Sequence, residues 1–161
     1  MFKVYYPSKE LARGYSFKEI THRRLIAGRK EGCWLEINHD SVSGQHLMFE
    51  IEVPRPGKAV PKITSEKIRK KLYITSLSPT HGTFSKDTWE TGFQKVGDNE
   101  RTEIKSGTRI KLGTNGPELF IVHKDHEKAS DVKEAFNDWL EEIRKSTELK
   151  NRHGLYFNRK S

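Results

Sequence analysis

Residues 25–46 read LIAGRKEGCWLEINHDSVSGQH, and this stretch decides which fold the chain adopts. An apolar run ends at Gly28 and Arg29, a second short run follows at 34–37, and the sequence from Ser43 to His46 leads into a third. Short apolar runs bounded by Gly, Asn, Asp and Ser are typical of β-strands joined by turns. The stretch therefore predicts consecutive strands whose connections carry an arginine and a serine.

Similar short runs continue on both sides of this stretch. We expect strands at 2–6, 15–21, 23–28, 34–37, 46–53, 71–77, 92–96, 108–113 and 118–123. In residues 46–53 the apolar side chains alternate with polar ones, so that they share one face. Many short strands with turns between them, without a repeat or a helix–strand alternation, predict an all-β antiparallel sandwich. The longer connections at 54–68 and 97–107 are rich in charged residues, and we expect them to be exposed loops.

The C-terminal part of the chain has a helical period. Its apolar side chains recur at helical spacing, at Val132, Ala135, Phe136, Trp139, Leu140 and Ile143. This stripe predicts an amphipathic helix over 131–149, with Ser130 as its N-cap. The helix is expected to pack on the sandwich, and the alternative is that its aromatic stripe binds a partner. The predicted domains are a sandwich at 1–124 and a helix with a basic tail at 125–161, packed on or extending from it.

Composition limits the class of protein. The chain has 161 residues, 33% of them hydrophobic, with a mean hydropathy of −0.83, which fits one domain with a modest core. No apolar run is long enough for a membrane span, and residues 1–10 lack a secretory signal. The lone Cys33 favours an intracellular location; we interpret it as an unreactive core residue, with a reactive thiol as the alternative. The net charge of +8 favours anionic partners.

The sequence gives little support to catalysis. The seven histidines are scattered, and His123 and His126 have no cysteine nearby to complete a zinc set. No serine sits in a nucleophile elbow, and no glycine-rich phosphate loop precedes a helix. We therefore expect no enzyme activity in this region, no cofactor and no metal, although a longer protein containing it could be an enzyme.

Three predicted turns carry groups that suit a phosphate. Arg29 follows the strand at 23–28, Ser43 precedes the strand at 46–53, and Thr80 follows the strand at 71–77. Loops at one end of a sandwich converge in space. A guanidinium supplies a planar charged fork for a phosphate, and hydroxyls donate to its remaining oxygens. The pattern predicts an anion pocket at one end of the fold.

The order of these motifs resembles the forkhead-associated (FHA) domain family. A Gly-Arg pair is followed by Ser-x-x-His, by THGT at 80–83, by SGTRIKLG at 106–113 and by the closing strand LFIV at 119–122. The resemblance covers residues 1–124. It implies an antiparallel β-sandwich of about eleven strands that binds phosphothreonine peptides through loops at one end.

Carried over by position, the resemblance implies two groups of site residues. Contact with the phosphopeptide is expected from Arg29, Lys30, Ser43, Gly44, Thr80 and His81. Support of the binding loops is expected from Gly28, His46 and Gly82. Here Gly28 forms the turn that places the arginine, and the histidine braces the loop from inside; Lys30 either adds charge at the rim or is an ordinary solvated lysine.

The chain departs from the family pattern at three places. His81 stands where the family usually has Asn, and a neutral imidazole donates from one ring nitrogen and accepts at the other, so it does not present the two groups side by side as an amide does. Gly44 stands where Arg or Asn is common, and residues 106–108 replace an acidic residue, Gly and Asp. The first two departures bear on peptide affinity and specificity, and the third on turn chemistry alone.

The expected function is a phosphothreonine-dependent interaction module. It would recruit phosphorylated partners in signalling, in the DNA damage response or the cell cycle, as a monomer in the nucleus. The alternatives are a basic nucleic-acid-binding β-domain and an assembly module that binds an unphosphorylated partner. Weak, nonspecific contact with nucleic acid through the basic surface is expected in addition, and no membrane contact.

Overall fold

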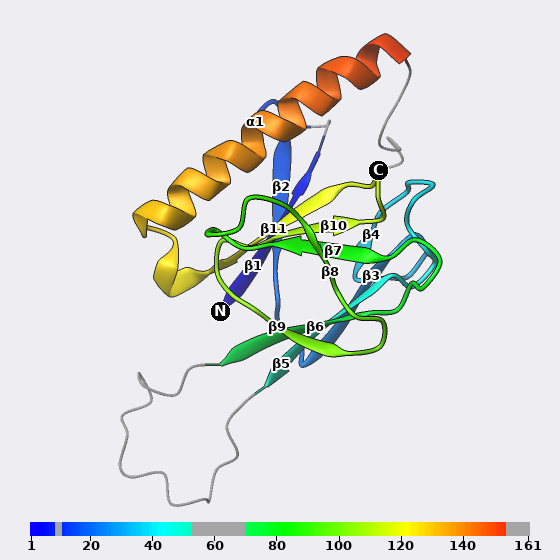
Figure 1. The fold of residues 1–161 in the computed structure, drawn as a ribbon, viewed down its shortest axis with the longest axis vertical. Coiled ribbons are helices and arrows are strands. Elements are labelled where there is room, and N and C mark those ends of the chain that lie inside the picture. The colour runs from blue at the N-terminus through cyan, green and yellow to red at the C-terminus, as the bar shows by residue number, and fades with distance from the viewer. Residues whose placement is uncertain (9–10, 53–69, 154–161) are drawn as a thin grey trace, which may run out of the picture.

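The computed structural model describes residues 1–8, 11–52 and 70–153, and it contains a sandwich of two sheets with one long C-terminal helix (Figure 1). The all-β prediction is therefore confirmed. The elements are β1 (Phe2–Pro7), β2 (Tyr15–Glu19), β3 (Arg24–Gly28), β4 (Leu35–Glu36), β5 (Leu47–Glu52), β6 (Lys71–Ser76), β7 (Thr83–Lys86), β8 (Gln94–Lys95), β9 (Arg101–Ile104), β10 (Arg109–Leu112), β11 (Glu118–His123), the short 3-10 helix η2 (Lys124–His126) and α1 (Ser130–His153).

The eleven strands form two sheets. One has six strands in the order β2-β1-β11-β10-β7-β8, and the other has five in the order β4-β3-β5-β6-β9. Neighbouring strands are antiparallel except β3 and β4, which pair in parallel. This parallel pair is the one exception among the described strand pairs to the expected antiparallel sandwich.

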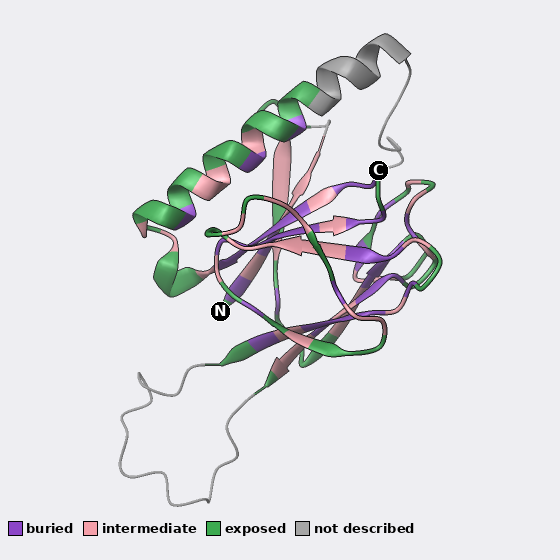
Figure 2. Cartoon of the chain, in the orientation of Figure 1, coloured by how far each residue is buried: buried purple, intermediate pink, exposed green. Residues whose placement is uncertain are grey.

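The core lies between the two sheets. The alternation predicted for 46–53 is visible in β5, where Leu47 and Phe49 are fully buried while Glu52 is exposed. Ile74 of β6 and Ile110 of β10 are also fully buried and contribute to the same cluster. Figure 2 shows the buried residues concentrated on the strands and exposed residues along the outer surface of α1. Val53 and the predicted loop at 54–68 lie outside the described residues.

Two strands were not predicted. The charged segment 97–107, expected as a loop, contains β9, because Ile104 is buried in the core while Arg101 and Glu103 face outward. Arg101 is held on that outer face by Glu50 and pairs with its Oε1 at 3.0 Å. The segment at Thr83–Lys86 forms β7, which is too short and too polar to stand out in the sequence.

The C-terminal helix packs against the six-stranded sheet. Its predicted apolar stripe forms a second core with Phe120 and Val122 of β11, and Trp139 at its centre is fully buried. The Trp139 indole N–H also donates to the Glu118 carbonyl at 3.0 Å. The helix extends beyond the predicted range of 131–149, and it begins with the Ala129 carbonyl accepting from Lys133 N–H, so Ser130 lies inside the first turn and is not the N-cap. Whether residues 1–124 form a separate folding unit stays a prediction.

No helix in the described part of the chain has a long enough apolar segment to cross a membrane.

Candidate functional site at the loop end of the sandwich

Three connections meet at one end of the sandwich, at the right of Figure 1. They are the segments between β3 and β4, between β4 and β5, and between β6 and β7. Backbone hydrogen bonds join the first two, from Arg29 N–H to the Ser43 carbonyl at 2.9 Å and from Lys30 N–H to the Gly44 carbonyl at 3.0 Å. The third is joined to the second by a bond from Leu77 N–H to the His46 carbonyl at 2.8 Å. The turns that carry the predicted residues are therefore brought together.

Gly28 permits the close contact between the first two connections. A Cβ atom at this position would lie 2.2 Å from the Gly44 carbonyl oxygen, far inside van der Waals contact. The backbone of Gly28 does not adopt a positive φ, so the glycine is not needed for turn conformation. The sequence predicted a glycine at this position because of a turn. The structure shows a different reason, which is that Gly28 is required for the close approach of two backbones.

His46 lies fully buried behind the three connections. Its Nδ1 accepts from Ser43 N–H at 3.0 Å, and its Nε2–H donates to the Gly82 carbonyl at 2.7 Å. These two bonds require the neutral Nε2–H form of the ring. Burial lowers the pKa of His46; the bond to Gly82 opposes this effect, and the nearby His81 adds to it. The ring thus joins the second and third connections.

The hydroxyl groups of the buried Ser78 and the half-buried Ser43 link the second and third connections. The hydroxyls of Ser43 and Ser78 lie 2.5 Å apart, and His81 N–H donates to Ser78 Oγ at 3.3 Å. If Ser78 donates to Ser43 Oγ, the Ser43 hydroxyl proton remains available for an anion. Ser78 was not among the predicted site residues. The sequence signal for Ser78 is its place in a Ser-Pro turn three residues before His81. In the structure this turn is closed by the hydrogen bond from Gly82 N–H to the Ser78 carbonyl.

The remaining predicted residues lie at the rim of this loop end. The Arg29 side chain is half-exposed, and its Nη1 lies 3.8 Å from a carboxylate oxygen of the fully exposed Asp40, so this ion pair is weak. Thr80 and Lys30 are exposed. The side chain of Thr80 makes no hydrogen bond to another described residue, so the structure places it near the site without tying it to the Ser43–Ser78 pair.

The His81 ring is half-buried beside the ring of His46. Its centre lies 6.4 Å from that of His46, with the two planes nearly parallel at 17°. The backbone carbonyl of Gly82 accepts from both the His46 ring and Gly113 N–H. Gly82 itself adopts a φ of 76°, a conformation that other residues rarely tolerate. The Gly82 carbonyl therefore anchors the turn that presents His81 to both His46 and Gly113.

Cys33 belongs to the same connection between β3 and β4 as Arg29. The residue is half-buried, and its thiol donates to the Gly44 carbonyl with a sulfur–oxygen distance of 3.4 Å. Burial raises the pKa of the Cys33 thiol. Because the thiolate is the reactive form, these surroundings favour the unreactive interpretation.

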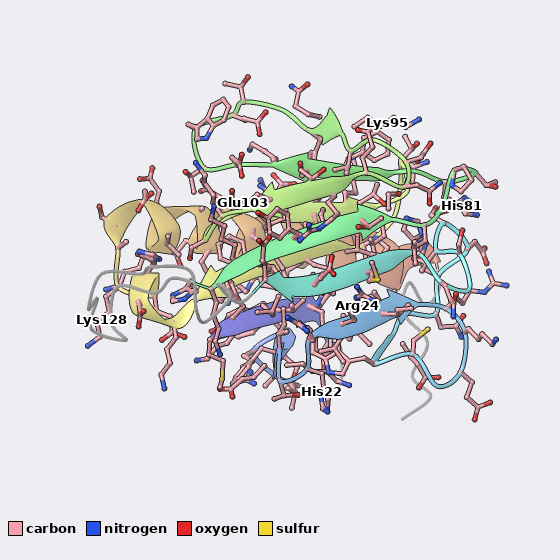
Figure 3. The ribbon with its side chains drawn as sticks, turned by 90° about the horizontal axis from the view of Figure 1, so that it is seen from below. His22, Arg24, His81, Lys95, Glu103 and Lys128 are labelled. Atoms are coloured by element: carbon pink, nitrogen blue, oxygen red, sulfur yellow. The ribbon has the colours of Figure 1, made fainter. Side chains whose placement is uncertain are left out.

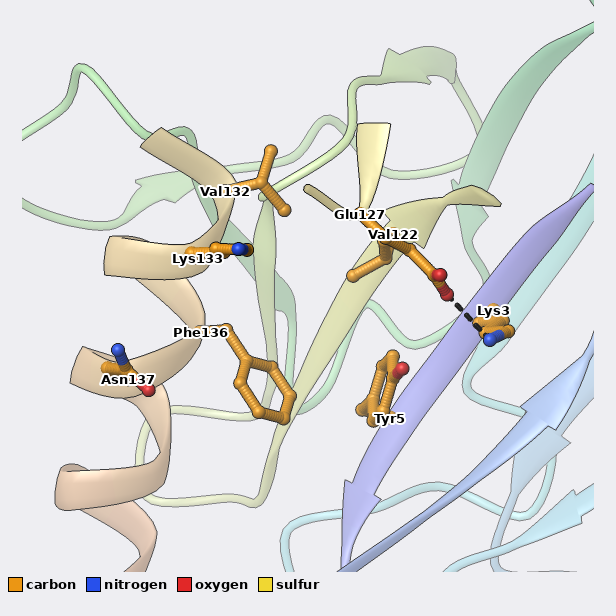
Figure 4. A pocket seen from close by; sticks show the side chains of 8 residues that line it. All are labelled: Lys3, Tyr5, Val122, Glu127, Val132, Lys133, Phe136 and Asn137. Carbon is orange, nitrogen blue, oxygen red and sulfur yellow. Dashed lines mark ion pairs between the residues drawn. The ribbon is translucent and has the colours of Figure 1, made fainter. Parts of the chain in front are cut away.

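A pocket of about 390 Å³ lies elsewhere, between α1 and the strands β1 and β11 (Figure 4). Its lining includes Tyr5 and Phe136, whose ring centres are 5.0 Å apart, and the ion pair of Lys3 with Glu127 at 2.6 Å. None of the predicted phosphopeptide residues lines it. Within the described ranges, no three His, Cys, Asp or Glu side chains gather as a metal site would require.

Comparison with known proteins connects this geometry to a family. The sequence pattern of the FHA domain matches residues 25–113, which is more than half of the chain. No curated protein matches the chain by sequence.

Solved structures resemble the fold at low sequence identity. The N-terminal FHA domain of S. cerevisiae Rad53p, in complex with a phosphothreonine peptide, is 16% identical with a TM-score of 0.53, covering 77% of this chain and 94% of that domain. The FHA domain of human APLF, in complex with an XRCC1 bisphospho peptide, is 16% identical with a TM-score of 0.53, covering 76% and 97%. Full-length yeast Pml1p is 18% identical with a TM-score of 0.53, covering 76% and 81%.

Proposed function

Since the chain belongs to the FHA domain family, we propose that its loop end binds phosphothreonine peptides and so recruits phosphorylated partner proteins. The observation that carries this proposal is that the backbone of Arg29 is bonded to Ser43, whose hydroxyl pairs with Ser78 and whose N–H is held by His46. The FHA domains of Rad53p and APLF are complexed with phosphopeptides, which supports the same class of ligand here.

Each group at the loop end suits a different part of the phosphate. Phosphothreonine carries about −1.5 to −2 charges at neutral pH, and the half-exposed Arg29 offers it a planar pair of donors. The Ser43 hydroxyl donates to a second oxygen while it accepts from Ser78. Thr80 and Lys30 lie at the rim, where a hydroxyl and a cation add contacts once the ligand is seated. Binding then depends on the phosphate more than on the peptide around it.

His81 is proposed to contact the peptide backbone beside the phosphothreonine. Its own N–H is engaged with Ser78, so the imidazole ring is the part that remains for the ligand. A ring offers one donor and one acceptor at fixed positions, in contrast to the two-atom amide of Asn. Gly44, exposed and without a side chain, leaves room for the peptide on the opposite side.

Calorimetric titration with matched peptides tests this function. A threonine peptide and its phosphorylated form are titrated into wild type, Arg29→Ala and the control Arg23→Ala. We expect wild type and the control to bind the phosphorylated form alone. Arg29→Ala should lose about 2–5 kcal/mol of binding free energy, because it removes the planar charged donor and leaves the phosphate without its partner.

The same titration separates the alternatives. Equal affinity for both peptides in wild type, or an unchanged affinity in Arg29→Ala, would contradict phosphate recognition. A partner bound in its unphosphorylated state would favour the assembly module. The proposed setting, nuclear signalling in the DNA damage response or the cell cycle, rests on the sequence prediction alone, and capture of phosphorylated nuclear proteins by wild type but not by Arg29→Ala would support it.

A further inference from the structure

A row of alternating cations and an aromatic ring crosses the six-stranded sheet next to the loop end. Lys95 of β8 pairs with Phe84 of β7, and Phe84 pairs with Lys111 of β10, so the three side chains stand on one face of adjacent strands. The Lys111 ammonium group lies 5.4 Å from the centre of the Phe84 ring and 4.5 Å from that of Phe93. We call Lys95, Phe84 and Lys111 the cationic row.

The cationic row begins beside the turn that carries His81. A Cβ atom at Gly82 would lie 3.7 Å from Cε of Lys95 and 3.5 Å from the Phe84 ring. In Figure 3 His81 and Lys95 lie at the same end of the molecule. A peptide that contacts His81 and continues past Gly82 therefore meets Lys95 first and Lys111 farther along the row.

The charges of the row are not neutralised by the protein. Glu118 stands opposite Lys111 on β11, but its carboxylate is bound by Arg109 with a nitrogen–oxygen distance of 2.6 Å. Lys95 is exposed, and neither it nor Lys111 forms an ion pair with another residue in the described ranges. Two unpaired ammonium groups beside a ring suit a ligand that carries negative charge on an aliphatic stem.

We propose that the cationic row selects phosphothreonine peptides with a further anionic side chain next to the phosphothreonine, either a carboxylate or a second phosphate. The inference rests on the proposed phosphopeptide function and names the class of peptide that the same site prefers. Lys95 holds the anion, Phe84 contacts the stem of the side chain, and Lys111 extends the positive surface to residues farther from the phosphothreonine.

A peptide series measures this preference. Each peptide contains one phosphothreonine, and the flanking positions on either its N-terminal or its C-terminal side are alanines, glutamates, lysines or one phosphoserine. Wild type should bind the glutamate peptide of one side about two- to five-fold more tightly than the alanine peptide, as expected for an exposed charge pair. The phosphoserine peptide should gain more because it carries more charge, and higher salt should shrink both gains.

Charge reversal assigns the preference to the row. Lys95→Glu should abolish the gain from glutamate and favour the lysine peptide, while the affinity for the alanine peptide stays close to that of wild type. Lys128→Glu makes the same change in net charge at the opposite end of the molecule (Figure 3) and should leave the preference intact. Because Lys95 is exposed, the reversal is expected to leave the fold intact, which thermal unfolding checks.

Three results would overturn the inference. Equal affinities of wild type for alanine and glutamate peptides on both sides would remove the preference itself. Equal effects of Lys95→Glu and Lys128→Glu would show only a long-range charge effect. If wild type binds none of the phosphothreonine peptides, including the alanine peptides, both the proposed function and the preference would be overturned. This result differs from the other two, which leave the proposed function standing.

Discussion

Gly28 and His46 hold the loop end together by opposite means. Gly28 lets the Gly44 carbonyl approach its own backbone because it has no side chain, whereas His46 fills the interior and bonds to two loops at once. Neither residue is placed to contact a ligand directly. Gly28 fixes the distance between the connection that carries Arg29 and the one that carries Ser43, and His46 fixes the distance between the Ser43 connection and the turn at Gly82.

Replacing Gly28 with alanine should destabilise the protein. The new methyl group would overlap the Gly44 carbonyl oxygen, so the two loops must separate. We expect a loss of about 1–3 kcal/mol in the free energy of unfolding, measured by urea denaturation, and weaker phosphopeptide binding. Gly92→Ala is the matched control, because a Cβ there meets no atom within 4 Å. Equal stability of the two variants would contradict the steric argument.

Acid should weaken the loop end through His46. Because the folded protein lowers the pKa of His46, the unfolded chain binds the proton more readily. The free energy of unfolding therefore decreases as the pH decreases. The free energy of unfolding should be full above about pH 6.5, the ordinary value, and should decline as the pH falls toward the lowered pKa.

Chemical denaturation of two variants at pH 8, 7, 6 and 5 isolates this residue. His46→Gln should be less stable at every pH and should show a flatter decline between about pH 6.5 and the lowered pKa. His22→Gln, at an exposed position, should keep the slope of wild type. The same slope in His46→Gln and wild type would show that other groups cause the pH dependence.

Motif order predicted part of the loop end and missed the rest for physical reasons. The sequence from Ser43 to His46 identified the brace, since the three-residue spacing lets the ring reach back to the serine N–H. Ser78 could not be recognised, because its partner is 35 residues away and the contact exists only after the sheets form. Lys95 was missed for the same reason, as its neighbour Gly82 is brought near by the pairing of β7 with β8.

At the scale of elements, hydrophobic periodicity predicted long elements better than short ones. The stripe of α1 was correctly assigned because six apolar residues share one helical period. Strand β9 was read as a loop because only Ile104 is buried among charged neighbours. Its outward charges are satisfied across strands, with Arg101 bound to Glu50 and Glu52, and sequence order alone does not reveal such pairs.

Removing the indole of Trp139 should weaken the contact between α1 and the sheet. The side chain is fully buried and also loses its hydrogen bond to the Glu118 carbonyl. Trp139→Ala should cost about 3–5 kcal/mol in the free energy of unfolding, measured by denaturation followed by circular dichroism. Asp138→Ala, on the exposed side of the same turn, should change stability by less than about 0.5 kcal/mol.

The outcome also bears on the predicted boundary at residue 124. If Trp139→Ala unfolds α1 while the sandwich persists, two separate transitions will appear. A single transition would mean that the helix and the sheets unfold together. An unchanged stability would contradict the packing role of Trp139.

At the scale of the whole molecule, net charge and the loop end make separable contributions. The charge of +8 is spread over the chain and does not depend on the geometry of any loop. The loop end depends on the contacts of Arg29 and Ser43. A generic polyanion and a phosphopeptide should therefore respond differently to the same variants.

Nucleic acid should bind weakly, without sequence preference and with steep salt dependence. Anisotropy of a labelled single-stranded oligonucleotide should show affinity falling sharply between about 50 and 200 mM salt. Arg29→Ala should change this affinity no more than Arg23→Ala does, because each removes one of many charges. A specific loss of oligonucleotide binding in Arg29→Ala, at constant salt, would instead favour the nucleic-acid alternative for the loop end.

The three tryptophans form a set of built-in optical probes. Trp139 is fully buried under α1, Trp34 is half-buried beside Phe49, and Trp89 is 75% exposed on a turn closed by the hydrogen bond from Glu90 N–H to the Asp87 carbonyl. A water-soluble quencher should reach Trp89 first and Trp139 last. Release of α1 would move the emission of Trp139 to longer wavelength while that of Trp89 stays constant, so intrinsic fluorescence can follow the helix and the sandwich separately without an attached dye.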